Sequence, residues 1–371
     1  MTEYTLVATA AFGLESVVAR ELKALGYEKA SVENGRVSFS GSDMDIARVN
    51  IWLRCADRVL LKMGTFHASD FDELFDGIQT IPWGALVPPT GAVHVTGRSV
   101  KSRLTSVPAC QSVVKKAIIE SMKKKYSLDE FPETGPEFPV DFVLQDDVMS
   151  VYMDTTGPGL HKRGYRTGTG QAALKETLAA GIVYLSRWKP DIALIDPFCG
   201  SGTIAIEAAL MGKNIAPGIN REFTSEKWGF IDPHVWEDVR RDAREKENKV
   251  QLNISASDID ESVIVKARRN ARHAGVLSSI KFAQRDLVDL AFTSDRGIVV
   301  CNPPYGERSG DKRSTGELVK KMREMFDSVS GWSIFVFTGF EDFERYYGKH
   351  ADSNRKLYNG RIKCFLYQFR S

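Results

Sequence analysis

An Asn-Pro-Pro-Tyr segment at residues 302–305 combines groups that suit the chemistry of a planar amine. It follows an apolar run at residues 297–300 that is typical of a buried strand. Each proline fixes its φ near −65° and lacks an N–H group, so the segment is stiff and offers bare carbonyl oxygens. Asn302 and the Pro303 carbonyl supply two acceptors for an exocyclic amine, and Tyr305 supplies a ring that stacks on the base carrying it. We therefore expect Asn302, Pro303 and Tyr305 to be catalytic, although a proline turn at a strand end gives the same pattern.

A glycine loop earlier in the chain provides a candidate cofactor site. It follows Asp196 at the end of a short strand-like run and reads Cys199-Gly200-Ser201-Gly202-Thr203. Glycines permit a tight turn and a close approach of the backbone to a ligand, and the start of the following helix favours an anionic group. The loop lacks the third glycine of the dinucleotide fingerprint and the Lys-Ser/Thr of a P-loop. We expect this loop, Asp196 and Asn302 to contact the cofactor.

Two further acids follow strand-like runs and extend the candidate cofactor site. Asp258 is placed to accept the two hydroxyls of a ribose, and Asp286 to accept from an adenine amino group. Ile259 and Leu287, one residue after each acid, are placed to hold the adenine ring between them. If Asp258 or Asp286 stood alone, we would interpret it as a helix cap. Asp260 is interpreted as the N-cap of a helix over residues 261–273.

The order and spacing of these residues resemble those of the class I S-adenosylmethionine-dependent methyltransferases that methylate amines. Two further stretches narrow the resemblance, Leu160-His161-Lys162-Arg163-Gly164-Tyr165-Arg166 and Ala173-Leu174-Lys175-Glu176. With them, the chain resembles the THUMP-containing RNA guanine-N2 methyltransferases, and among these the bacterial enzymes of large-subunit ribosomal RNA. The resemblance covers essentially the whole chain and is most specific over residues 157–310.

The resemblance implies S-adenosylmethionine as cofactor and a direct methyl transfer, without a metal, to the N2 amine of a guanine in RNA. Some members of the family carry a second methyltransferase domain. We expect this chain to be the form with a single methyltransferase domain. Three alternatives stay open. The first alternative is a different methyl acceptor, either the N6 amine of adenine in DNA or RNA or the side-chain amide of a protein glutamine. The second is a guanine in transfer RNA, and the third is an RNA-binding assembly factor without catalysis.

The charge distribution favours a nucleic-acid partner. The net charge is only +2, yet residues 98–126 hold eight basic residues and one acid, Glu120. A helix over residues 109–126 places most of its lysines opposite an apolar stripe, and a phosphate backbone is a natural partner for them, although a solvated helix face is the alternative. We expect the RNA-binding residues to be Lys101, Arg103, Lys115, Lys116, Lys123, Lys124, Lys162, Arg163 and Arg166.

Turn signals and periodicity divide the chain into three parts. Residues 1–56 predict a ferredoxin-like α+β unit, with helices over 13–26 and 43–53 and a hairpin at Asn34-Gly35. Residues 57–155 predict a second α+β portion that resembles a THUMP domain, with strands near 58–63, 92–96, 140–144 and 149–153. Residues 156–371 predict a Rossmann-like α/β methyltransferase domain. It is expected to follow a linker at 155–159, to begin with a helix over 172–188 and to end in an antiparallel hairpin around Asn359-Gly360.

Composition excludes several classes of protein. With 371 residues, 43% hydrophobic and 26% charged, the chain has the profile of a globular protein. Its five cysteines stand far apart, which argues against a zinc ribbon or a disulfide framework and for a reducing compartment. No apolar run is long enough for a membrane span, and the N-terminus does not resemble a signal peptide. We expect a cytoplasmic protein without a metal site; the oligomeric state stays open.

Overall fold

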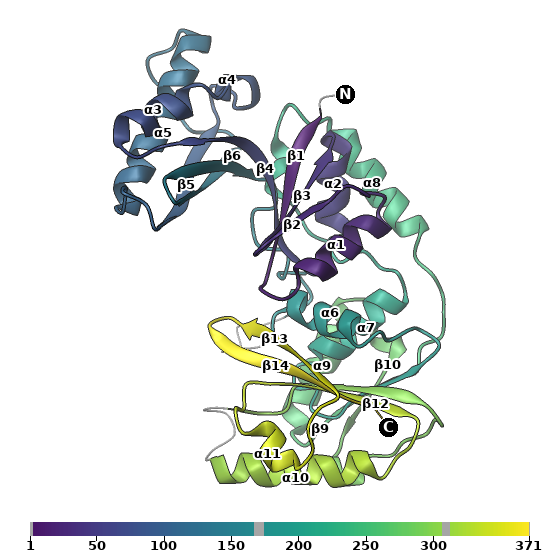
Figure 1. Ribbon diagram of the computed structural model, residues 1–371. Coiled ribbons are helices and arrows are strands. Elements are labelled where there is room, and N and C mark those ends of the chain that lie inside the picture. The colour runs from purple at the N-terminus through teal and green to yellow at the C-terminus, as the bar shows by residue number, and fades with distance from the viewer. Residues whose placement is uncertain (1–2, 167–173, 306–311, 371) are drawn as a thin grey trace.

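Two seven-stranded sheets organise the computed structural model, which describes residues 3–166, 174–305 and 312–370 (Figure 1). The first sheet has the strand order β2-β3-β1-β4-β7-β6-β5 and belongs to the N-terminal part of the chain. Its elements are β1 (Tyr4–Ala10), α1 (Glu15–Ala24), β2 (Ser31–Glu33), β3 (Arg36–Gly41), α2 (Asp43–Trp52), β4 (Ala56–His67), α3 (Phe71–Gln79), α4 (Trp83–Leu86), β5 (Ala92–Val100), α5 (Val107–Tyr126), β6 (Glu137–Gln145) and β7 (Val148–Asp154).

Strand β4 joins the two α+β units predicted over residues 1–56 and 57–155 into one sheet. It pairs with β1 over its first half and with β7 from Leu60 onwards, both in antiparallel fashion. The proposed boundary between residues 56 and 57 therefore falls at the start of a strand shared by both units. The Asn34-Gly35 hairpin is found as predicted, with Gly35 at φ +76° between β2 and β3. Helix α2 begins as expected at Asp43, because Ser42 and Asp45 form a reciprocal capping box.

The second sheet has the strand order β10-β9-β8-β11-β12-β14-β13. Its pairings are parallel from β10 to β12, whereas β14 is antiparallel to both β12 and β13. The reversed strand and the Asn359-Gly360 hairpin confirm the predicted closing hairpin of a class I methyltransferase domain. The elements are α6 (Glu176–Leu185), β8 (Ala193–Asp196), α7 (Thr203–Gly212), α8 (Pro233–Glu245), β9 (Ile254–Asp258), α9 (Glu261–His273), β10 (Ile280–Gln284), β11 (Gly297–Cys301), α10 (Lys312–Asp327), β12 (Trp332–Thr338), α11 (Phe343–Tyr347), β13 (Ser353–Asn359) and β14 (Ile362–Arg370).

Two details of this part correct or complete the predictions. Helix α6 begins at Glu176, later than predicted; residues 172 and 173 lie outside the described ranges. The linker predicted at residues 155–159 follows β7 directly, but most of it is packed rather than exposed. Thr155 and Thr156 are fully buried and hydrogen-bonded, Thr155 Oγ1 donating to Val59 O and Thr156 Oγ1 donating to Asn50 Oδ1. This segment is a packed junction, because its hydroxyls satisfy the backbone and amide groups that it covers.

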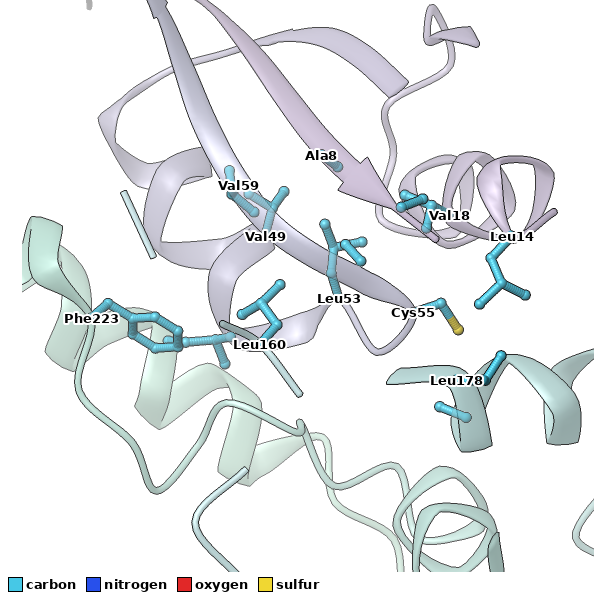
Figure 2. Close-up of a cluster of buried hydrophobic side chains, with 14 of the residues drawn as sticks. Ala8, Leu14, Val18, Val49, Leu53, Cys55, Val59, Leu160, Leu178 and Phe223 are labelled. Carbon is cyan, nitrogen blue, oxygen red and sulfur yellow. The ribbon is translucent and has the colours of Figure 1, made fainter. Parts of the chain in front are cut away.

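Apolar side chains continue the core across this junction. In Figure 2, Leu160, Leu178 and Phe223 of the catalytic part lie toward Leu53 and Cys55 of the ferredoxin-like unit. Helix α8 of the catalytic part also runs beside α2 (Figure 1). The N-terminal unit is thus fixed against the catalytic part by a shared core. All five cysteines are buried and free. Among the described helices, none has the length and apolarity to cross a membrane.

Candidate active site

Four neighbouring strands bring the predicted site residues to one edge of the second sheet. Asp196 and Asp258 are the last residues of β8 and β9, Asp286 follows β10, and Asn302 follows β11. Because parallel strands present their carboxyl ends at the same edge, these four side chains line one cavity of about 1290 Å³. A pocket for one small ligand usually measures about 300–1000 Å³. The cavity therefore has room for a cofactor and part of a second group.

Asp196 is the most buried acid of this cavity. Its side chain is 1% exposed, and Oδ1 accepts a hydrogen bond from the Phe198 amide at 3.3 Å. Oδ2 is buried without a hydrogen-bond partner among the described residues. Burial raises the pKa of the Asp196 carboxyl well above its usual range, and the nearby Asp258 carboxylate contributes to the rise. A buried carboxylate oxygen without a partner is suited to a cationic donor, which would lower this pKa again.

The glycine loop is held by backbone contacts that explain its sequence. Gly200 and Gly202 have φ of +51° and +82°, values that glycine adopts without strain. A Cβ at Gly202 would lie 3.1 Å from the Ala267 Cβ, so this glycine also permits close packing against α9. The Cys199 amide donates to Ser257 O, and Gly200, Ser201 and Thr203 line the cavity. Gly202 thus packs against α9 and does not line the cavity.

Asp258 and Asp286 both keep acceptor capacity toward the cavity. The Asp258 carboxylate accepts from the Gly200 amide at 2.9 Å and from the Asp260 amide at 3.1 Å, one bond per oxygen. Each carboxylate oxygen has two lone pairs, so two acceptor sites remain. Asp286 caps the following turn through the Val288 amide and also lines the cavity, so the cap does not remove it from the candidate cofactor site. Asp260 caps α9 as predicted, through the Ser262 amide.

The predicted adenine clamp consists of one exposed and one buried residue. Ile259 is 65% exposed and Leu287 is buried, and both line the cavity beside the acids that precede them. An isoleucine exposed to this degree at the rim of a cavity costs hydration free energy that a flat apolar ligand would recover. The exposure of Ile259 therefore fits a ligand ring better than a core position.

The Asn-Pro-Pro-Tyr segment forms the opposite wall of the same cavity. The Asn302 Oδ1 atom is buried and has no hydrogen-bond partner among the described residues. Pro303 and Tyr305 line the cavity beside it. The Tyr305 hydroxyl points to the C-terminal hairpin, 3.5 Å from the Cys364 Sγ and 3.3 Å from the Asn359 Nδ2, which donates to it. The ring is therefore anchored at its polar end.

The structure corrects the expectation for Arg163. This residue was expected on an RNA-binding surface, but it is 5% exposed. Its guanidinium donates to the carbonyl oxygens of Leu160 and Arg54 and forms an ion pair with the buried Glu207 at 3.5 Å. Glu207 lies on α7, directly after the glycine loop. Arg163 therefore joins the ferredoxin-like unit to helix α7. Because its guanidinium is buried, an RNA phosphate cannot reach it.

Arg166 lies at the wall of the cavity. Its Nη2 donates to Thr203 Oγ1 and to Leu174 O, both at 2.9 Å, and its Nε lies 3.3 Å from the Glu176 carboxylate. It was expected to contact RNA, whereas the structure places it beside the glycine loop. Lys162 of the same stretch is exposed.

Sequence reasoning missed several residues that line the cavity. They lie on α9, on α10, in loops or at the tip of the β13–β14 hairpin; they are Lys266, Arg269, Arg285, Lys321, Gly339, Asn359 and Ile362. Lys266 and Arg269 stand three residues apart on α9, so a helical projection of residues 261–273 would have placed both on one face. The Asn359-Gly360 signal marked the hairpin tip but not its position beside the cavity, and the remaining members come from distant elements.

The predicted RNA-binding lysines of α5 differ in their partners. Lys115 forms an ion pair with Glu133 at 2.9 Å, Lys123 one with Glu120 at 3.1 Å, and Lys124 donates to the Gln79 side chain at 2.8 Å. Lys116 is exposed, with its Nζ 5.9 Å from the ring centre of Phe75. In the preceding loop, Lys101 and Arg103 are exposed, and Arg103 lies 3.6 Å from Asp147.

Family models match the three parts of this chain in order. The model of the RlmL ferredoxin-like domain matches residues 5–60 and that of the THUMP domain matches residues 68–154. The model of the RMKL-like methyltransferase domain matches residues 163–368, more than half of the chain. The chain belongs to the RMKL-like methyltransferase family. It is thus an S-adenosylmethionine-dependent methyltransferase with an RNA-binding THUMP domain.

Individual relatives of this RMKL-like methyltransferase agree with the family models. A Bacillus subtilis protein named "Putative RNA methyltransferase YpsC" is 47% identical over 100% of this chain and 96% of its own length. The ribosomal RNA large subunit methyltransferase K/L of Psychromonas ingrahamii is 36% identical over 96% of this chain and 49% of its own length. The crystal structure of SMU.472 complexed with SAH is 43% identical, with a TM-score of 0.95 over 100% of this chain and 99% of that one.

The contrast between Lys116 and Lys115 gives a prediction for RNA binding. Replacing Lys101 and Lys116 by Gln should reduce the dependence of RNA affinity on salt, by close to one unit of log–log slope for each lost phosphate contact. Lys115→Gln should change the slope less, because Glu133 already balances that charge. The measurement is a salt titration of RNA binding. An unchanged slope in the Lys101/Lys116 variant would mean that these lysines only solvate the domain.

Proposed function

We propose that this enzyme methylates the N2 amine of a guanine in large-subunit ribosomal RNA. The observation that carries the proposal is the buried Asn302 Oδ1, which has no hydrogen-bond partner in the described structure and lies in the same cavity as Pro303 and Tyr305. A buried acceptor of this kind carries a desolvation cost unless a donor reaches it, and an exocyclic amine is such a donor. The similarity to the ribosomal RNA large subunit methyltransferase K/L supports large-subunit ribosomal RNA as the substrate. The choice of guanine rests on the resemblance of the sequence to RNA guanine-N2 methyltransferases.

In the proposed reaction, the enzyme aligns an amine with a methyl group. The guanine leaves its stack, as base-modifying enzymes require, and Tyr305 stacks on it. Asn302 Oδ1 and the Pro303 carbonyl accept the two amino hydrogens and direct the nitrogen lone pair at the methyl carbon of the cofactor. The new C–N bond forms as the C–S bond breaks, and the nitrogen, now cationic, releases one proton to water. Alignment and a polar environment for this charge supply the catalysis.

The cofactor is proposed to lie along the carboxyl ends of β8, β9 and β10. Asp196 and the glycine loop hold the methionine end, and the free acceptor sites of Asp258 take the ribose hydroxyls. The adenine lies between Ile259 and Leu287, with Asp286 accepting from its amine. Arg166, which lies beside Thr203, is placed to contact the methionine carboxylate, and it therefore leaves the set of proposed RNA contacts.

A product analysis tests this proposal directly. The enzyme is incubated with labelled S-adenosylmethionine and, separately, with ribosomal and transfer RNA from a strain that lacks it, and the RNA is digested to nucleosides. We expect N2-methylguanosine in large-subunit RNA. Label in N6-methyladenosine would contradict the choice of base, and label in transfer RNA alone would contradict the choice of RNA. Absence of label from both, with the cofactor bound, would contradict methylation of these RNAs.

A further inference from the structure

The tip of the β13–β14 hairpin forms one rim of the active-site cavity. Asn359 and Ile362, the last pair of the hairpin, line the cavity, and the Tyr305 hydroxyl contacts Asn359 and Cys364. Figure 1 shows the hairpin projecting past the catalytic sheet, beneath the ferredoxin-like unit. A polymer whose nucleotide enters this cavity therefore passes close to the hairpin.

The face of the hairpin that points away from Tyr305 alternates cations and aromatic rings. Lys356 pairs with Phe365 and Tyr358 pairs with Lys363 in the antiparallel register, so the four side chains share one face. The Lys356 Nζ lies 5.4 Å from the ring centre of Tyr358, and the Lys363 Nζ lies 5.9 Å from that of Phe365. Both lysines are exposed.

Phe12 of the ferredoxin-like unit extends this surface. It is 49% exposed, and its ring meets Tyr358 edge-on, with ring centres 5.7 Å apart at an interplanar angle of 83°. The Lys356 Nζ lies 5.8 Å from its ring centre. Arg355 fixes the hairpin to the loop after Phe12, its Nε donating to Gly13 O at 2.8 Å and its Nη2 to the Ser16 hydroxyl at 2.9 Å. Two segments from opposite ends of the chain thus form one surface.

The composition of this surface indicates its ligand. Residues 353–370 contain five basic residues and no acid. One exposed and two partly exposed aromatic rings, interleaved with cations, match single-stranded nucleic acid, whose bases stack on rings while its phosphates contact cations. The lysines lie outside the core, and an apolar protein partner would have to desolvate them. The positive charge and the aromatic rings of this surface therefore favour RNA as its ligand.

We propose that Phe12, Lys356, Tyr358 and Lys363 form a platform for the single-stranded nucleotides that flank the methylated guanine. The proposal rests on the proposed function, because it takes the RNA substrate to be the polymer that enters the cavity. Target bases in RNA are reached in loops and single strands, where neighbouring bases are free to stack on a protein. The platform holds these neighbours while the target base turns into the cavity.

Two double variants test the platform by its charge and by its rings. Lys356→Gln with Lys363→Gln should weaken binding of a ribosomal RNA fragment and lower the salt slope by about 0.7 per lost contact, the value for single strands. Phe12→Leu with Tyr358→Leu keeps apolar volume and removes the ring faces, and it should weaken binding by roughly tenfold or more per lost stack. Tyr358→Phe, which keeps the ring, should bind as the parent does.

A control variant and a second RNA separate the possible outcomes. Lys281→Gln changes an exposed lysine on β10, at the far edge of the same sheet, and should leave RNA binding unchanged. All variants should keep parent affinity for S-adenosylmethionine, which shows that they are folded. Binding of a uridine oligonucleotide is measured in parallel, because it does not depend on the methylated target. Parent-like binding of both RNAs by both double variants would overturn the platform, even if the parent forms N2-methylguanosine. Weakened oligonucleotide binding would support the platform even if the product analysis contradicts the proposed function.

Discussion

Asn302→Ala should lower kcat by roughly 100-fold or more, a larger factor than any loss of affinity for S-adenosylmethionine. The Asn302 oxygen is buried and has no hydrogen-bond partner among the described residues, so it is ready to accept from the amine as that nitrogen becomes cationic. The loss of one preorganised polar group beside a developing charge typically costs about 10²–10³ in kcat. Single-turnover methylation measures this effect, and calorimetry measures cofactor affinity.

Two comparison variants separate the Asn302 contact from general damage to the segment. Asn302→Asp keeps an acceptor oxygen of similar shape and should retain more turnover than Asn302→Ala. Tyr305→Phe should retain most of the activity, because the hydroxyl contacts Asn359 and Cys364 of the hairpin and the ring alone faces the base. If Tyr305→Phe lost as much turnover as Asn302→Ala, the hydroxyl would take part in the chemistry and the stacking role would be wrong.

The residues that lie together at one cavity, as expected, share a local cause. Asp196 and Asp258 each end a strand that the apolar pattern marks and Asn302 directly follows one, and parallel strands gather such ends at one edge. The Asn359-Gly360 hairpin and the Asp260 cap are also local, because the chemistry of two or three residues fixes their backbone. Positions of this kind can be predicted without knowledge of the packing.

The errors concern residues whose surroundings come from distant parts of the chain. Arg163 stands between basic neighbours in the sequence, as a surface residue would, but the Arg54 carbonyl and Glu207 surround it in the structure. Thr155 belongs to a stretch rich in glycine, which is typical of linkers, yet it is buried against Val59. At both positions the burial results from contacts with residues far away in the sequence, and the local composition does not indicate it. Phe12 and Lys356 illustrate the same limit, since only the fold brings them together.

Asp196→Asn should weaken S-adenosylmethionine binding by roughly tenfold to a hundredfold and, at the same time, stabilise the cofactor-free protein at high pH. The affinity loss follows from hydrogen bonds to a charged group, which contribute about 1.5–3 kcal/mol, with about 1.4 kcal/mol for each tenfold. The proposed partner is the ammonium of the methionine end, facing the Oδ2 atom that lacks a partner in the described structure. Calorimetry at fixed pH measures this change.

The stability effect of the same substitution follows from the pKa of Asp196. Burial raises this pKa in the folded protein well above its unfolded value, so the neutral carboxyl is the form that the fold favours. Its contribution to stability is complete below the unfolded pKa and is lost as pH rises through the folded pKa. Asparagine does not titrate. The cofactor-free variant should therefore unfold at a higher temperature than the parent above the raised pKa, and the advantage should shrink as the pH is lowered.

Cofactor binding to the parent should release a proton when the pH lies below the raised pKa of Asp196. A cationic ammonium beside Asp196 favours the ionised carboxylate, so at a pH below the raised pKa the proton leaves as the cofactor binds. Calorimetry in two buffers of different ionisation enthalpy counts the protons released, and the count for the parent should exceed that for Asp196→Asn. Equal proton release and equal affinity in the two proteins would place the ammonium elsewhere. A variant that loses affinity but shows no gain in stability at high pH would mean that the pKa of Asp196 is not raised in the cofactor-free protein.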